Sequence, residues 1–160
     1  MSNANASTSS KTVGEFSVQV LTTGHWPSYK AIEVNLPPAM ASCVAAFKTY
    51  YEEKHGASRR LAWTHSLGNA TVKGVFGKKT YDLQLTTLQA AALAAFNDTT
   101  GAQSFASLQQ SLGLTEEVLK RVLHSLACGK YRVLRKVSAE ESGGGAIRVT
   151  DAFAVNDQFS

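Results

Sequence analysis

The residues that could carry out chemistry are few and dispersed along this sequence of 160 residues. No histidine has the spacing of a helical metal site, and none stands beside a cysteine or a pair of carboxylates with ligand spacing. Cys43 and Cys128 lie in apolar helical stretches, where a small buried side chain is the usual role, rather than a disulfide or a nucleophile. No nucleophile elbow occurs. We therefore expect no catalytic residue, no metal ligand and no cofactor. The histidines are His25, His55, His65 and His124.

One stretch, GVFGKKT at residues 74–80, resembles a phosphate-binding loop. Its two glycines are separated by two residues, whereas a loop that wraps a phosphate needs four. The stretch also lies between two segments of alternating polarity. It therefore predicts a hairpin turn, not a nucleotide site.

The formal net charge of +4 is unevenly distributed. Residues 1–86 carry nine Lys or Arg and five Asp or Glu, whereas residues 87–160 carry seven of each class. Six of the early bases lie within residues 54–79, where no acid occurs. The positive potential is therefore expected near the middle of the chain.

No apolar segment of the sequence is long enough to indicate a membrane protein. The longest unbroken apolar run, residues 90–96, is far shorter than the roughly 20 residues that span a bilayer. Residues 1–15 are mostly small and polar, and we expect a disordered leader there. We expect no membrane contact and an intracellular location, in the cytoplasm, the nucleus or both.

Residues 16–86 are expected to form a first domain, a helix with a β-meander. The prolines at 37 and 38 open a helix that ends at Gly56, with an apolar stripe formed by Met40, Val44, Phe47 and Tyr51. Polarity then alternates over three segments, 61–67, 70–76 and 81–85, separated by glycine turns. This pattern predicts a three-stranded antiparallel sheet with one covered face.

Residues 87–160 are expected to form a second domain with the element order of a winged helix. Thr86 and Gln89 form a capping box for one helix, and Ser104 and Thr115 cap two more. Strands are predicted at 131–137 and in the region 147–155. The fold class is therefore α+β: an amphipathic helix and an antiparallel meander, followed by a winged helix.

A winged helix often reads DNA with the start of its second helix. Here that start carries Glu116 and Glu117, and residues 87–160 have no net charge. Nucleic-acid binding depends on neutralising phosphates, so we do not expect nucleic acid as a partner. The alternative function, a winged-helix nucleic-acid-binding module, would use the basic cluster at 54–79.

Several segments in order along residues 16–159 resemble the cullin homology region, most closely that of plant and green-algal cullins. The segments are VLTTGHWPSY (20–29), FKTYYEEKHGASRRLAW (47–63), HSLG (65–68), QLTTLQAAALAAFN (84–97), HSLACGKYRVL (124–134) and DAFAVNDQF (151–159).

The resemblance implies a non-catalytic scaffold of a ubiquitin ligase complex that supports ubiquitin-dependent protein degradation. In this family an α/β segment accepts a strand from a RING-box protein, and the winged helix packs within the scaffold. Longer family members also bind Skp-type adaptors and F-box proteins through a helical-repeat region that these 160 residues do not contain. The lysine motif that receives a ubiquitin-like modifier is also absent from them.

The partner-binding residues expected for strand addition lie in the predicted meander. Main-chain pairing would supply affinity, and large alternating side chains would set the register. These residues are Leu61, Trp63, Val72, Phe76 and Leu83.

Overall fold

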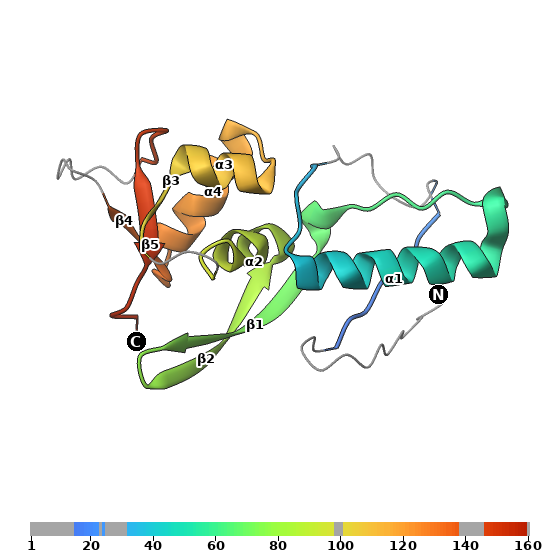
Figure 1. Ribbon diagram of the computed structural model, residues 1–160, viewed down its shortest axis with the longest axis horizontal. Coiled ribbons are helices and arrows are strands. Elements are labelled where there is room, and N and C mark those ends of the chain that lie inside the picture. Colours follow the sequence, from blue (N-terminus) through green and yellow to red (C-terminus); the bar gives the residue numbers. More distant parts are fainter. Residues whose placement is uncertain (1–14, 23, 25–31, 98–100, 138–145, 160) are drawn as a thin grey trace. The chain divides into compact units, whose positions relative to one another are not determined.

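The computed structural model describes residues 15–22, 24, 32–97, 101–137 and 146–159 (Figure 1). Apart from Glu15, the predicted leader lies outside these residues. The chain divides into two compact units, one containing residues 36–64 and the other containing residues 32–35 and everything from 65 onward. The division between these units falls between residues 64 and 65. The domain boundary predicted between residues 86 and 87 stays a prediction.

The first unit is built on helix α1 (Pro38–His55), followed by a short 3₁₀ turn, η2 (Gly56–Ser58). The helix begins and ends as predicted: proline occupies its first turn, and Gly56 follows it with a φ of 61°. Phe47 is the buried residue of α1, and the rings of Tyr50, Tyr51 and Trp63 surround it. The apolar stripe thus has one buried anchor.

The second unit begins with the 3₁₀ turn η3 (His65–Leu67) and an antiparallel hairpin of β1 (Asn69–Phe76) and β2 (Lys79–Thr86). Two residues connect the strands. Gly77 has a φ of 62° and Lys78 does not have a positive φ, which suits a type II′ turn with glycine first. The predicted hairpin turn at this glycine is confirmed.

The prediction of a three-stranded meander is wrong. Residues 59–64 form no strand, and the amide of Gly68 donates to the carbonyl of His65 at 3.1 Å, closing a turn. Trp63 packs its ring edge-on against Phe47 at a centroid distance of 5.7 Å. The alternating polarity at 61–67 therefore does not reflect a β-strand. The backbone there is irregular, and the apolar side chain of Trp63 packs against another part of the first unit.

The remainder of the second unit combines three helices with a small sheet. The helices are α2 (Thr87–Ala94), α3 (Phe105–Leu112) and α4 (Glu116–Ala127). Strands β3 (Gln103–Ser104), β5 (Ala152–Val155) and β4 (Leu134–Val137) form an antiparallel sheet in that spatial order. The α+β class is confirmed, and the element order agrees with the predicted one; its assignment as a winged helix stays a prediction.

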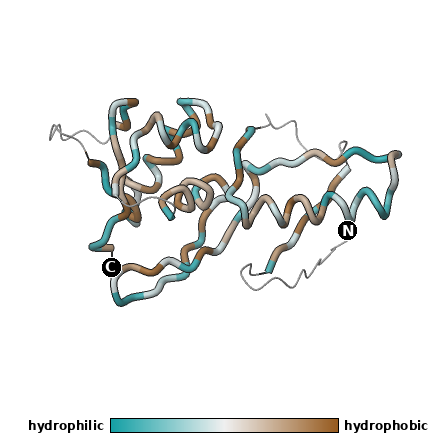
Figure 2. Tube along the Cα trace, in the orientation of Figure 1, coloured by the Kyte–Doolittle hydropathy of each residue, from teal (hydrophilic) through white to brown (hydrophobic). Residues whose placement is uncertain are grey.

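Helix caps and apolar burial explain why this part folds. The side chains of Thr86, Ser104 and Thr115 accept amide hydrogens at the starts of α2, α3 and α4, as predicted. Figure 2 shows that α2 is predominantly hydrophobic. One apolar core unites α2, α3, α4 and the small sheet. Its fully enclosed members include Leu108, Leu119, Leu123, Leu134 and Phe153. In the described part of the chain, no helix combines the length and apolarity needed to cross a membrane.

Candidate partner-binding site on the hairpin

The β1–β2 hairpin has one half-buried face and one exposed face. Exposure alternates along both strands, and the register pairs Val72 with Leu83 and Gly74 with Tyr81 on the half-buried face. The opposite face pairs Lys73 with Asp82. Hydrophobic side chains therefore gather on one side of the hairpin while charged groups remain in solvent, which is the pattern of a sheet with one covered face.

Both long edges of this hairpin are unpaired in the described residues. The strands β1 and β2 form a sheet of two, and the second sheet contains only β3, β5 and β4. An edge of this kind presents a row of backbone donors and acceptors to any extended chain that can reach it. Backbone pairing is thus the interaction that the hairpin is best equipped to make.

The base of the hairpin is joined firmly to α2. The Thr86 amide donates to Oε1 of Gln89 at 3.0 Å, and the Gln89 amide donates to Oγ1 of Thr86 at 3.2 Å. Gln89 also donates from Nε2 to Oγ of Ser125 in α4 at 2.8 Å. One glutamine therefore links the end of β2, the start of α2 and the last turn of α4.

Gly68 makes the second connection at the base. Its carbonyl accepts the amide of Thr87 at 3.0 Å. A Cβ at this position would lie 2.3 Å from Oγ1 of Thr87, so a larger residue would force the Thr87 hydroxyl to move.

The tip of the hairpin contacts a segment from the other end of the sequence. The ring of Phe159 lies 4.8 Å from the ring of Phe76 and 5.2 Å from the ring of Tyr81. Phe76 and Tyr81 are themselves 6.2 Å apart. These three rings form a cluster, called here the tip cluster, that covers the half-buried face near the turn.

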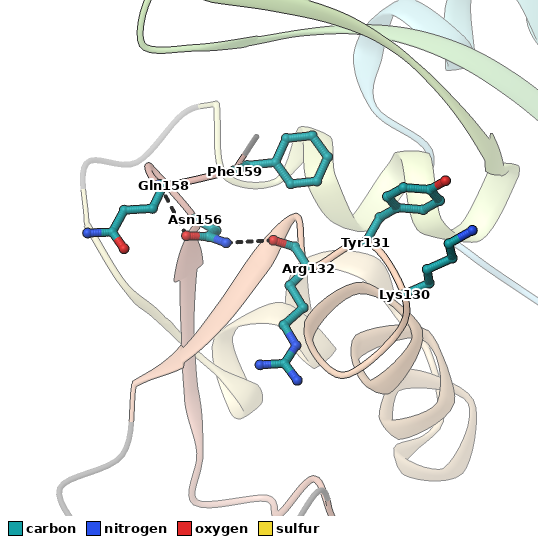
Figure 3. Close-up of a pocket in the computed structure, with 6 residues that line it drawn as sticks. All are labelled: Lys130, Tyr131, Arg132, Asn156, Gln158 and Phe159. Carbon is teal, nitrogen blue, oxygen red and sulfur yellow. Dashed lines mark hydrogen bonds between the residues drawn. The ribbon is translucent and has the colours of Figure 1, made fainter.

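A shallow cavity of about 230 Å³ opens beside the tip cluster (Figure 3). Its lining residues carry basic, amide and aromatic groups, and none carries a carboxylate or a thiol. The cavity therefore lacks a general base and a nucleophile of the usual kinds, which gives no support to an active site. The lining residues are Lys130, Tyr131, Arg132, Asn156, Gln158 and Phe159.

The structure brings together three of the five residues predicted from the sequence. Val72, Phe76 and Leu83 share the half-buried face of the hairpin. Leu61 and Trp63 belong to the first unit and lie outside any strand. Their place in the predicted meander is therefore wrong. Sequence reasoning missed Phe159, whose ring contact with Phe76 spans most of the second unit's sequence and leaves no local pattern.

The basic cluster at 54–79 is divided between the two units. Lys54 and Arg59 lie in the first unit, near His55, while Lys73, Lys78 and Lys79 lie on the hairpin. Partial burial, Arg59 and Lys54 together lower the pKa of His55. The six bases therefore belong to two different units and not to one structural element. Within the described residues, no group of three or more His, Cys, Asp or Glu side chains could hold a metal ion.

The family described as the cullin alpha+beta domain matches residues 20–159. The chain belongs to the cullin family. It is 46% identical to Cullin-2 of Arabidopsis thaliana over 146 residues, which are 91% of this chain and 19% of that protein.

Other cullins are similar over the same extent. The identity is 41% over 145 residues to Cullin-1 of Oryza sativa, covering 89% of this chain and 18% of that protein. It is 36% over 145 residues to Cullin-4A of Homo sapiens, covering 91% and 18%. This cullin chain thus spans about a fifth of the length of the curated relatives that it matches.

Proposed function

We propose that this chain is part of a cullin scaffold in a ubiquitin ligase complex and that it has no catalytic activity of its own. The free edge of the β1–β2 hairpin accepts a β-strand from a RING-box protein. Skp-type adaptors and F-box proteins would bind longer family members through other regions. The complex would act inside the cell, in the cytoplasm, the nucleus or both.

The observation that carries this proposal is a hairpin with eight residues in each strand and no third strand beside it in the described residues. A two-stranded hairpin is marginally stable in water, and a third strand or a packed helix is what makes such a sheet stable. Strand addition would satisfy the backbone of one edge and extend the sheet across two chains. Membership of the cullin alpha+beta domain family supports a protein partner for this edge.

The register indicates which amides point toward the partner. In a hairpin with a two-residue loop, the residues flanking the loop form a hydrogen-bonded pair, and hydrogen-bonded pairs then alternate with non-hydrogen-bonded ones. Starting from Phe76 and Lys79, the pair Val72 and Leu83 is bonded within the hairpin. The amides of residues 73 and 82 therefore point outward, one from each edge.

Two proline variants test the two edges separately. Lys73→Pro removes an outward donor from β1, and Asp82→Pro removes one from β2, without deleting a hydrogen bond between the strands. We expect one of these variants to bind a purified RING-box protein at least tenfold more weakly than the parent, by isothermal titration calorimetry. The other variant should bind as the parent does, because a strand can be added to only one edge at a time.

The matched controls are Lys73→Ala and Asp82→Ala, which remove the same side chains but keep the amides. Circular dichroism and thermal unfolding establish that each variant is folded. If the folded proline variants both bind with the parent's affinity, strand addition to this hairpin is wrong. If the alanine controls lose as much affinity as the prolines, side chains and not backbone pairing hold the partner.

A further inference from the structure

The hairpin is held at both of its ends. At the base, the capping box of Thr86 and Gln89 and the bond between Gly68 and Thr87 join it to α2. At the tip, the ring of Phe159 contacts Phe76 and Tyr81. Figure 1 shows the hairpin extending away from α2 toward the C-terminal end of the chain.

The segment that presents Phe159 is a compact turn, residues 156–159, called here the strap. The Phe159 amide donates to the carbonyl of Asn156 at 3.1 Å, and the Gln158 amide donates to Oδ1 of Asn156 at 3.2 Å. Asn156 also fastens the strap to the segment that precedes β4. Its amide donates to the carbonyl of Val133 at 2.9 Å, and its Nδ2 donates to the carbonyl of Arg132 at 2.8 Å (Figure 3).

We propose that Phe159 is a positioning residue that fixes the hairpin tip, so that the free edge is straight and ordered before a partner strand arrives. This inference rests on the proposed function, which makes that edge the binding site. The bond from Asn156 to Val133 ties the strap to the segment next to the small sheet, and Phe159 ties the strap to the hairpin tip. Apart from this contact, the hairpin packs against the helices of the second unit at its base.

The ring contacts of Phe159 are strong enough to change the fraction of molecules in which this marginally stable hairpin is ordered. An aromatic pair adds roughly two- to tenfold to an equilibrium constant beyond its buried area, and Phe159 makes two such pairs. When only a fraction of molecules has the binding-competent edge, the apparent affinity for the partner falls by that fraction. Losing Phe159 should therefore weaken binding although Phe159 need not touch the partner.

Phe159 can be removed without taking apart the hydrophobic core. It is half-buried and is not a member of the core formed by α2, α3, α4 and the small sheet. The variant Phe159→Ala should remain folded, and Phe159→Tyr should keep the ring contacts. Tyr131→Ala is the matched control, because Tyr131 lines the same cavity and its ring instead faces Nζ of Lys130 at 5.3 Å.

The first measurement is amide hydrogen exchange of the chain alone. In Phe159→Ala we expect amides near the hairpin tip to exchange about tenfold faster, while amides of α3 and α4 exchange at the parent rate. Phe159→Tyr and Tyr131→Ala should both match the parent. Parent-like exchange at the tip of Phe159→Ala would overturn the role of the strap.

The second measurement is the kinetics of RING-box binding by surface plasmon resonance. We expect Phe159→Ala to lower the association rate constant about fivefold and to leave the dissociation rate constant unchanged, because the bound edge is already ordered. A change confined to the dissociation rate constant would mean that Phe159 contacts the partner, which contradicts positioning. Failure of the parent to bind contradicts the proposed function instead, and the exchange experiment keeps that failure distinct from failure of the strap.

Discussion

The β1–β2 hairpin and the small β3–β5–β4 sheet lie in the same unit but are stabilised in different ways. The small sheet has short strands, and its central strand β5 contains Phe153 with 0% exposure, enclosed by the helices. The hairpin has strands of eight residues, and no residue in either strand is fully buried. The longer strands therefore belong to the less buried sheet.

The two sheets therefore have different roles: the small sheet stabilises the fold, and the hairpin is available to bind a partner. A sheet whose side chains are enclosed contributes free energy of folding, whereas a sheet whose edges are open can contribute free energy of binding. The core around β5 needs no partner to exclude water. The hairpin depends on its fastenings at Thr86 and Phe159 and, in our account, on a third strand from another chain.

The largest expected effect is loss of stability when the buried sheet is altered. Phe153→Ala removes a fully enclosed ring and should lower the free energy of unfolding by about 3–5 kcal/mol, as measured by urea denaturation. Leu83→Ala on the half-buried hairpin face should cost only about 1–2 kcal/mol, because less apolar surface is lost. Equal losses for the two variants would remove the contrast between the sheets.

A smaller loss is expected at the polar anchor beside β5. The carboxylate of Asp151, 5% exposed, accepts the Arg148 amide at 2.7 Å and pairs with Nζ of Lys136 at 2.9 Å. Asp151→Ala removes the ion pair with Lys136 and leaves the Arg148 amide without this acceptor, and it should cost about 2–3 kcal/mol in urea denaturation. Asp151→Asn keeps one acceptor oxygen and should cost less. An alanine variant as stable as the parent would show that this anchor is not needed.

The capping box tests the connection between the two regions. Thr86→Ala removes the acceptor at the start of α2 and should lower stability by about 1 kcal/mol, whereas Thr86→Ser keeps the hydroxyl and should retain most of it. Because Thr86 ends β2, hydrogen exchange should quicken at the hairpin base as well as in α2. Faster exchange in α2 alone would mean that the hairpin does not depend on this cap.

The smallest expected effect is a pH dependence of the free energy of unfolding caused by His65, at the start of the second unit. Partial burial lowers the pKa of His65 below its ordinary value of about 6.5. The unfolded chain therefore binds a proton more readily than the folded chain, so stability is greatest above pH 6.5 and declines as the pH falls through the folded pKa. His65→Gln should flatten this decline in urea titrations between about pH 7 and 5. An unchanged decline would assign it to other groups.

Local signals in the sequence were sufficient for the helices and the hairpin. The prolines before α1, the caps of α2, α3 and α4, and Gly77 each act within a few residues, so their effects can be inferred from neighbouring residues. The prediction of a third strand failed because alternation shows which side chains are apolar but not what they pack against. Trp63 packs against Phe47, which is 16 positions earlier and on a different element.

The candidate site was only partly predictable for the same reason. Val72, Phe76 and Leu83 could be placed on one face because period-two alternation fixes the face of a strand. The contact of Phe159 with Phe76 depends on how the chain returns after β5, which no local pattern encodes. Long-range aromatic contacts of this kind require the folded structure.

Strand addition to one edge of the hairpin is tested most directly by amide exchange across the hairpin, followed by NMR, with and without a saturating RING-box protein. We predict that the outward amides of one strand, either Lys73 and Val75 in β1 or Asp82 and Gln84 in β2, exchange at least tenfold more slowly in the complex, while those of the other strand change little. Formation of a complex in which neither set is slowed would contradict the account, because backbone pairing at the hairpin edge would then play no part in binding.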